Sequence, residues 1–462
     1  MTTTRQTAKS KKGAAGKKVA VKKAAGKAAA AAPHKLTLRS YQVGFGDCYL
    51  LTFHYGTGNR HVLVDFGSTA KSEDAPDDLL LRVAQDIRER CGGKLHVVVA
   101  THRHKDHISG FATNRKGDGP GDIIRGCHPD VVIQPWTEDP EARKDATKAT
   151  EVRPGKSIAF TDTLLHMQDV AAAVTAEVSH LKTGIGRALA GELAFLGEDN
   201  ISNRSAVENL IEMGKRGRAL FVNYDFNNPL DLAAELPGVT VRALGPPTLA
   251  QSDAIKKMKS SDAAEFWQLS AAAGRPVVKA SDPLFPEFAA RSVSLLSPPH
   301  TRWFVRRMNA IRGSRLLEIV RILDSVLNNT SAILLFEVGG KKLLFPGDAQ
   351  IENWSYALKT APESGQVLAL LKDVDVYKVG HHGSRNANPK SLWSLFTKKG
   401  VRESPGRLKT FVSTMPGKHG DPRRRTEVPR ASLVTALKTE SDYFSTEDLK
   451  PGALSKTFTI HL

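Results

Sequence analysis

The stretch that decides the fold of this chain is Leu95–Ala100 followed by Thr101-His102-Arg103-His104-Lys105-Asp106-His107. Its first part, Leu-His-Val-Val-Val-Ala, is short, β-branched and nearly continuous in apolar character, which is typical of a buried parallel strand. In open α/β architectures the residues that follow such a strand lie at the carboxyl edge of the sheet, where ligands bind. Three imidazoles and a carboxylate within six residues at that edge indicate a metal site.

The spacing within this motif suits two ions. His102 and His104 are two residues apart and can face one ion, whereas the adjacent pair Asp106 and His107 can reach a second. Hydrolytic sites with two metals hold their ions roughly 3.5–4 Å apart, so one loop can serve both. The alternative is a solvated polar loop, since single histidines are common on protein surfaces. Three histidines and an aspartate spaced this closely favour the metal site instead.

Two later segments follow the same pattern. Lys341–Ala349 is predicted to be a strand that ends in a Gly-Asp turn, which presents Asp348 where it could bridge two cations. Val374–Gly380 is predicted to be another strand, and it is followed by His381 and His382. A Gly-Asp pair alone is common in turns and is weak evidence for a metal site. Three strands in this order that each end in potential metal ligands are much stronger evidence.

Further segments complete an ordered set of motifs. Tyr41–Leu51 contains a glycine turn, His61–Gly67 is a second apolar strand, and Asn328–Leu335 precedes the Gly-Asp turn. Together with Lys378–Ser384 and the first motif, the set resembles the metallo-β-lactamase superfamily. It is most similar to the stand-alone relatives of the hydrolase domain of ComEC-type competence proteins, over most of the chain after residue 35.

The resemblance implies an α/β fold, specifically a four-layer αββα sandwich with metals at one edge between two sheets. It also implies hydrolysis of a bound ester or phosphodiester by metal-activated water. By position, the implied metal ligands are His102, His104, Asp106, His107, Asp348, His381 and His382. Asp106 and Asp348 would also be catalytic, because they position the reacting groups and balance their charge. Asp65 matches an aspartate that we expect to orient ligands from behind, and the alternative is a turn or helix-capping carboxylate.

One departure from the superfamily pattern concerns a histidine expected between the first motif and the Gly-Asp turn. The histidines in that interval lie in sequence that suits structural or exposed side chains: His128, His166, His180 and His300. Asn328 and Asn329 occupy the corresponding polar stretch, and neither is a strong metal ligand. The sequence therefore leaves one metal position without its expected histidine.

The amino-terminal segment differs from the rest of the chain in its strongly basic composition. Residues 1–35 carry ten Lys or Arg and no acidic residue, interleaved with Ala and Gly, and so supply ten of the 18 net positive charges. We expect this tail to be disordered and to bind nucleic acid or another polyanion by counterion release. The alternative is a role in solubility or targeting, although the segment has no apolar region typical of a signal peptide.

The length of 462 residues accommodates one elaborated domain over residues 36–462. No stretch approaches 18 uncharged apolar residues, so we expect no membrane helix. The three cysteines, Cys48, Cys91 and Cys127, are odd in number and form no paired motif, which indicates buried thiols in a reducing cytoplasm.

The remaining pattern predicts helices between the ligand-bearing strands. Pro76–Arg90 is amphipathic, with Leu80, Val83, Ala84 and Ile87 on one stripe, and it ends at two glycines. Further predicted elements are helices at 163–196, 204–213 and 429–437, and strands at 218–222, 239–244, 408–413 and 456–462.

A mainly helical, arginine-rich insertion is predicted at about 250–327. It could bind a phosphate-rich substrate, because arginine suits phosphate oxygens, or it could be an ordinary solvated helix pair. Ser384 and His419 are weak candidates for substrate contact, with a surface loop as the alternative.

The sequence therefore predicts a metal-dependent hydrolase that uses two divalent ions, Zn²⁺ or Mn²⁺. A phosphodiester is the preferred substrate, because the basic tail and the basic insertion both suit polyanions, and the activity would be nuclease-like. Two alternatives remain: a hydrolase of small esters, thioesters or lactones, and a nucleic-acid-binding module with a degenerate site.

Overall fold

The computed structural model describes residues 32–140, 204–252, 254, 327–415, 417, 427–450 and 452–462. The chain divides into residues 1–30 and residues 31–462, and the described residues all belong to the second unit. Several predicted features fall outside them: the tail up to residue 31, the helix at 163–196, most of the insertion at 250–327, and His166, His180, His300 and His419.

The first sheet has seven strands in the order β13-β1-β2-β3-β4-β5-β6. Their bounds are β1 (Lys35–Tyr41), β2 (Cys48–Tyr55), β3 (Gly58–Phe66), β4 (Val97–Val99), β5 (Val131–Pro135), β6 (Arg218–Val222) and β13 (Ser455–His461). The pairs from β13 to β3 are antiparallel, and those from β3 to β6 are parallel. The stretch Leu95–Ala100 thus contains a buried parallel strand, as its sequence predicts.

The second sheet has six strands in the order β12-β11-β10-β9-β8-β7. Their bounds are β7 (Val239–Gly245), β8 (Ile333–Val338), β9 (Lys341–Phe345), β10 (Val376–Lys378), β11 (Lys409–Val412) and β12 (Asp442–Ser445). It repeats the plan of the first sheet, because β7, β8 and β9 pair antiparallel and β9 to β12 pair parallel.

The main core lies between the two sheets. Alternate residues of each strand point to this side, so Val62 and Val64 of β3 and Val97 of β4 share one buried cluster with Phe336 of β8 and Phe345 of β9. Burying such side chains stabilises the fold by roughly 1.5–3 kcal/mol each.

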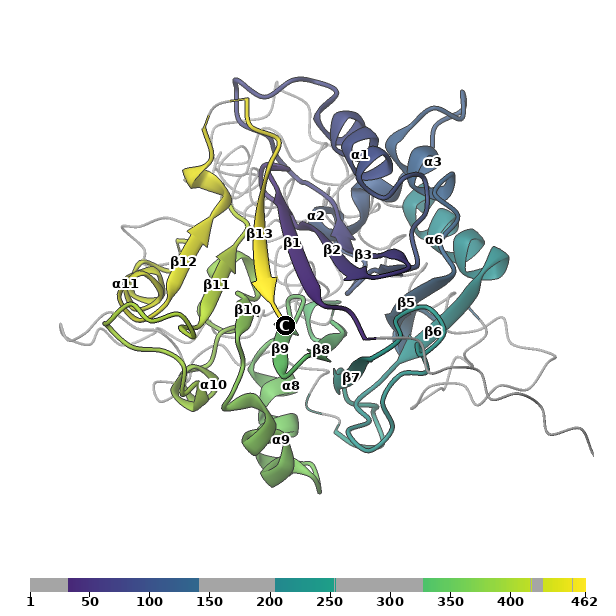
Figure 1. Cartoon of the computed structure of the whole chain (residues 1–462). Coiled ribbons are helices and arrows are strands. Elements are labelled where there is room, and N and C mark those ends of the chain that lie inside the picture. Colours follow the sequence, from purple (N-terminus) through teal and green to yellow (C-terminus); the bar gives the residue numbers. More distant parts are fainter. Residues whose placement is uncertain are drawn as a thin grey trace, which may run out of the picture. The chain divides into compact units, whose positions relative to one another are not determined.

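Helices cover the outer face of each sheet (Figure 1). The first sheet carries α1 (Leu79–Arg90), α3 (Pro120–Arg125) and α6 (Arg204–Arg216), whose apolar residues form one cluster with the outward residues of β3, β4 and β5. The second carries α8 (Ile351–Ser355), α9 (Ser364–Leu371), α10 (Lys390–Leu395) and α11 (Ala431–Glu440). The layers thus run helix, sheet, sheet, helix, in an α/β architecture built from two mixed sheets.

The short helical segments lie in the connections. They are α2 (Lys105–Ile108), η1 (Ser109–Phe111), η2 (Trp136–Glu138), η4 (Tyr356–Thr360), η5 (His381–Gly383) and η7 (Thr446–Asp448). Two of them, α2 and η5, carry predicted metal ligands.

Several sequence predictions need correction. Helix α1 begins three residues later than predicted, and its buried stripe starts at Leu79, with Leu80 packed half-buried against the same cluster. Strand β1 begins at Lys35 and pairs with β13 and β2, so the predicted tail 1–35 extends too far. The helix predicted at 204–213 continues to Arg216.

The structure also bears on the membrane helices and the cysteines. No described helix has the length and apolar character needed to cross a membrane. All three cysteines are free and buried, as predicted.

Candidate metal centre

The candidate centre lies where parallel strands of both sheets end. The residues that follow β4 form the loop and helix α2 with His102 to His107, and Asp65 lies at the end of β3. Asp348 follows β9, and η5 with His382 follows β10. Segments separated by more than 270 residues thus meet at one edge, as the sequence predicts.

Two glycines let the backbone approach α2 closely. A Cβ on Gly67 would lie 2.5 Å from the carbonyl oxygen of Lys105, and one on Gly46 would lie 2.1 Å from the carbonyl oxygen of Gly67. The backbone N–H of Asp47 donates to the carbonyl oxygen of Asp106 at 2.8 Å. The glycine turn between β1 and β2 is therefore part of the wall of the site.

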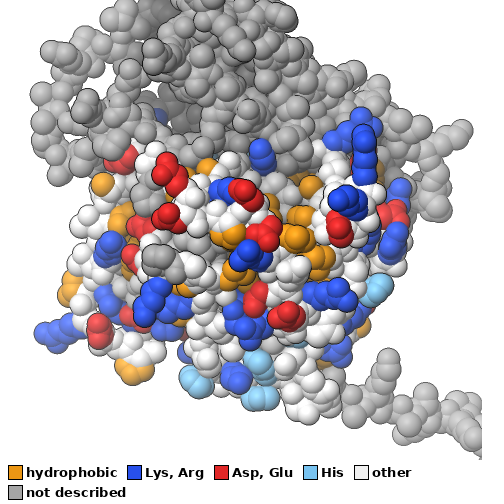
Figure 2. Space-filling model, turned by 90° about the horizontal axis from the view of Figure 1, so that it is seen from above, with side chains coloured by type: hydrophobic (Ala, Val, Ile, Leu, Met, Phe, Trp, Pro, Cys, Tyr) orange, Lys and Arg blue, Asp and Glu red, His pale blue; other side chains and the backbone are white. Residues whose placement is uncertain are grey.

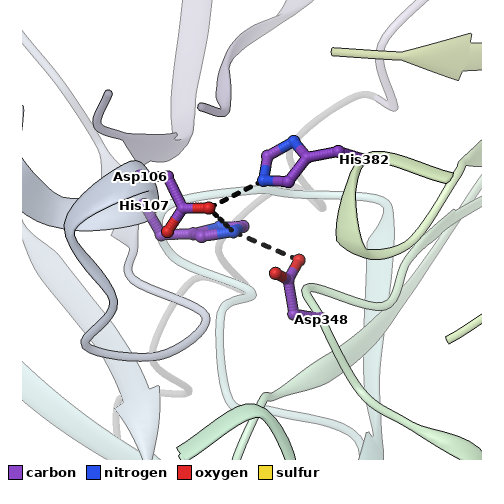
Figure 3. A group of neighbouring side chains, drawn as sticks. All are labelled: Asp106, His107, Asp348 and His382. Carbon is purple, nitrogen blue, oxygen red and sulfur yellow. Dashed lines mark hydrogen bonds and ion pairs between the residues drawn. The ribbon is translucent and has the colours of Figure 1, made fainter. Parts of the chain in front are cut away.

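Four side chains form a tight group: Asp106, His107, Asp348 and His382 (Figure 3). His382 Nε2 lies 2.8 Å from Asp106 Oδ2, and His107 Nε2 lies 3.1 Å from Asp348 Oδ1. All four residues are buried, and their ligand atoms lie within 4.8 Å of one another. Zinc–ligand bonds of about 2.0–2.2 Å put two ligands of one ion at most about 4.4 Å apart. Small side-chain rotations would therefore place all four around one cation.

The two histidines of this group are oriented for metal binding. His107 Nδ1 lies 2.8 Å from Asp65 Oδ2, and His382 Nδ1 lies 2.8 Å from the backbone carbonyl oxygen of Ser413. An acceptor at Nδ1 holds the proton there, so Nε2, which points toward Asp106 and Asp348, is the nitrogen that would give up its proton to bind a metal. The Oδ2 atom of Asp348 is buried and has no hydrogen-bond donor among the described residues. Imidazole and carboxylate ligands of this kind suit zinc and related ions, so these residues fit a divalent metal.

Asp65 has the supporting position that the resemblance implies. Besides its contact with His107, it accepts hydrogen bonds from the backbone N–H and the hydroxyl of Thr101, at 2.7 and 2.8 Å. One carboxylate thus fixes both the start of the first motif and the ring of its last histidine. The alternative role as a helix cap does not apply, because Asp65 caps no described helix.

The other three predicted ligands lie beside the tight group. His102 Nε2 is 3.0 Å from His104 Nδ1, and His102 Nε2 and His381 Nε2 lie 3.9 and 3.8 Å from Asp348 Oδ2. The two oxygens of Asp348 therefore face different histidines, because Oδ1 faces His107 and Oδ2 faces His102 and His381. His381 is the most exposed of these ligands, with 27% of its side chain accessible.

Charge balance at the centre depends on these contacts. Burial opposes a charge on His107, but the carboxylates of Asp348 and Asp106 raise its pKa well above the ordinary value. Burial likewise opposes ionisation of Asp348, yet His107 and His381 hold the pKa of that carboxyl well below its usual range. For His102, burial and the charge of His107 both lower the pKa. His107 thus supplies positive charge that a divalent cation would also supply, whereas His102 favours its neutral form.

Strained backbone occurs where the ligands are presented. Asp65, His381 and His382 have φ values of 53°, 46° and 50°, in the left-handed region that costs a non-glycine residue about 1–3 kcal/mol. Such strain concentrates at functional sites, where the surrounding structure holds it in place.

Other predicted residues make contacts of their own. The Ser384 hydroxyl donates to Asn386 Oδ1 at 3.0 Å, and His128 is exposed. Asn328 and Asn329 are fully buried, and Asn329 accepts hydrogen bonds from the amide of Asn353. His128 does not belong to the groups of His, Cys, Asp and Glu ligand atoms found among the described residues.

Sequence reasoning missed Asp47, Lys378 and Glu138. Asp47, Asp65 and His107 form a second group of potential metal ligands, and Lys378 makes an ion pair with Asp47. Glu138 accepts three hydrogen bonds from the guanidinium of Arg103, at 2.6 to 3.0 Å. The signal for Asp47 was its position in a Gly-Phe-Gly-Asp turn, whereas a lysine in an apolar strand and a distant glutamate gave none.

Comparison with known proteins adds no assignment, because no family model and no curated protein matches this chain.

Proposed function

We propose that this chain is a metal-dependent hydrolase of the metallo-β-lactamase type that cleaves phosphodiester bonds. The observation that carries the proposal is the buried group Asp106, His107, Asp348 and His382, formed by strand ends of two sheets. The order of the ligand motifs along the chain and the helix, sheet, sheet, helix layers support the same assignment.

The proposed centre holds two divalent ions, zinc or manganese. Asp106, His107 and His382 form the ligand set on one side of Asp348, and His102, His104 and His381 form the set on the other. Asp348 belongs to both sets, because its two oxygens face different histidines. Ions bound there would supply Lewis acidity toward a substrate oxygen and toward the attacking water.

The protein's own contribution is orientation and charge. Asp65 and the Ser413 carbonyl hold the Nδ1 protons of His107 and His382, so both rings keep Nε2 toward the centre. The N–H of His381 donates to Asp348 Oδ1 at 3.1 Å, which fixes that carboxylate. A centre fixed in this way needs little reorganisation during the reaction, which favours catalysis.

The preference for a phosphodiester comes from charge. Residues 1–35 hold ten Lys or Arg without an acidic residue. On the face drawn in Figure 2, Lys and Arg are instead interspersed with Asp and Glu. We therefore assign capture of nucleic acid or another polyanion to the tail, and cleavage to the metal centre.

The test is hydrolysis of single- and double-stranded DNA, RNA and a bis-aryl phosphodiester by the purified full chain with added Mn²⁺ or Zn²⁺. We expect cleavage that is lost with chelator and in Asp106→Asn. Asp130→Asn is the matched control, because this half-exposed carboxylate pairs with Lys94 away from the centre. Cleavage that survives in Asp106→Asn would contradict the proposal, and turnover of esters or thioesters alone would replace the phosphodiester as substrate.

Deleting residues 1–31 tests the assignment of the tail. The truncated chain should cleave the small bis-aryl substrate at the full rate but bind DNA more weakly, with a shallower dependence on salt. A binding module with a degenerate site would also bind DNA more weakly without the tail, but neither the full nor the truncated chain would turn over any substrate.

A further inference from the structure

A buried ammonium lies against the candidate centre. Lys378 ends β10, and only 3% of its side chain is exposed. Its Nζ makes an ion pair with Asp47, lies 3.7 Å from Asp348 Oδ1 and donates to the carbonyl oxygen of Gly347 at 3.3 Å. Burial opposes its charge, but Asp47 and Asp348 raise its pKa.

Asp47 depends on this ammonium. Its side chain is fully buried, and neither carboxylate oxygen has a hydrogen-bond donor of normal geometry among the described residues. The nearest imidazole nitrogens, His107 Nδ1 and His382 Nδ1, lie 3.6 and 3.8 Å away, and they already face Asp65 and the Ser413 carbonyl. The Lys378 ammonium is therefore the main counter-charge of Asp47.

The group Asp47, Asp65 and His107 has the chemistry of a metal site, but its ligand atoms are engaged. Asp65 accepts from Thr101 and from His107 Nδ1, and the Asp47 carboxylate faces Lys378. An ion in this group would compete with the ammonium for the same carboxylate and would pull His107 Nδ1 away from Asp65.

We propose that the Lys378 ammonium takes the place of a metal ion in the group formed by Asp47, Asp65 and His107, and so prevents metal binding there. Metal ions would then bind only to the ligand sets on either side of Asp348. This inference rests on the proposed metal centre. Lys378 is a positioning residue in this account, because it acts through Asp47 and Asp348.

The test compares full-length Lys378→Met, Lys378→Arg, Asp47→Asn and the double variant Asp47→Asn with Lys378→Met. The first readout is the number of Mn²⁺ ions per chain, measured by native mass spectrometry. Lys378→Met should bind one ion more than the wild type, because Asp47 is then left without a cation. Lys378→Arg and the double variant should bind the wild-type number. A wild-type ion count in Lys378→Met would overturn the proposal.

The second readout is the melting temperature in excess chelator, which does not depend on bound metal. Lys378→Met should melt several degrees below the wild type, because a buried carboxylate loses its counter-charge, and adding Asp47→Asn should recover most of that loss. A double variant no more stable than Lys378→Met would overturn the charge pairing. Lys378→Met could fail to fold in chelator. In that case a double variant that folds supports the charge pairing, and a double variant that does not fold overturns it.

The two readouts separate this inference from the proposed function. A wild-type chain that binds no Mn²⁺ would contradict the metal centre, whereas the recovery of stability would still show whether Lys378 and Asp47 are coupled.

Discussion

The two sheets have the same order of antiparallel and parallel strand pairs, but they position their candidate metal ligands through different kinds of contact. In the first sheet, carboxylates anchor the ligand loop: Asp65 holds Thr101 and His107, and Glu138 holds Arg103 between two predicted ligands. In the second sheet two of the ligands are held directly by backbone groups. The Ser413 carbonyl orients His382, and the His381 N–H holds Asp348.

This difference determines how each half can fail. A carboxylate that anchors a loop can be removed by one substitution, whereas a backbone carbonyl cannot. The second half is instead sensitive to the conformation of its turns, because Gly347 and Gly383 have φ values of 54° and 84°. Variants of these carboxylates therefore test the first half, and variants of these two glycines test the second.

The largest effect is expected from Glu138→Gln. It leaves the guanidinium of Arg103, which is 7% exposed, without its bidentate carboxylate, and breaking a buried ion pair costs about 3–5 kcal/mol. Chemical denaturation in chelator measures this loss of unfolding free energy. Glu208→Gln is a control, because its ion pair with Arg204 on α6 is exposed, and exposed pairs contribute about 0–1 kcal/mol. Equal effects of the two variants would show that the buried anchor is unimportant.

Gly347→Ala should have the next largest effect and test the second half. A Cβ there would lie 2.8 Å from Thr101 Cβ and 3.1 Å from Ser331 Cβ, and overpacking of this kind costs about 1–3 kcal/mol in addition to the strain of positive φ. Gly340→Ala is the matched control, because Gly340 has a φ of 76° but open space at its Cβ position. The difference in melting temperature between the variants isolates the contact with Thr101, and no difference would contradict it.

Asp65→Asn should weaken metal binding with a smaller effect on folding. The amide can no longer hold the Nδ1 proton of His107 as a carboxylate does, and loss of such a supporting group typically lowers metal affinity about 10–100-fold. Titration of metal-free protein with Zn²⁺ against a competing chelator measures the change. Asp130→Asn again serves as control, and an unchanged affinity in Asp65→Asn would mean that the carboxylate does not orient His107.

The smallest effect concerns pH and two buried histidines outside the centre. Burial lowers the pKa of His61 and of His96 to about 4, below the ordinary value of 6.5. The unfolded chain therefore takes up protons first as pH falls, so these residues contribute stability above pH 6.5 that is lost progressively toward pH 4.

His96→Gln should reduce this dependence. We expect the unfolding free energy, measured in chelator between pH 7.5 and 4, to fall less steeply than in the wild type. His461→Gln, at an exposed position of β13, should leave the slope unchanged. A steeper fall in His96→Gln would show that His96 does not stay neutral in the folded chain.

The features predicted correctly from the sequence are those that depend on neighbouring residues along the chain. The β-branched run before Thr101 predicted a buried parallel strand, and the order of polar residues after three strands predicted which side chains meet at one edge. Strand β12 and helices α8 to α10 were not predicted, because their segments are short and carry weak periodicity.

The supporting contacts were also beyond the sequence. Lys378 lies in an apolar strand and Glu138 lies 35 residues from Arg103, so only the fold shows that each meets an opposite charge. The same holds for the Ser413 carbonyl, because a backbone acceptor leaves no trace in residue type.

The most direct test of the central claim is the number of ions bound when Asp348 is changed. We predict two Mn²⁺ or Zn²⁺ ions per wild-type chain by native mass spectrometry, and loss of both in Asp348→Asn at an ion concentration that fills the wild type, because one carboxylate serves both ligand sets. The account would be contradicted by a wild-type chain that binds no ion, or by an Asp348→Asn chain that still binds two.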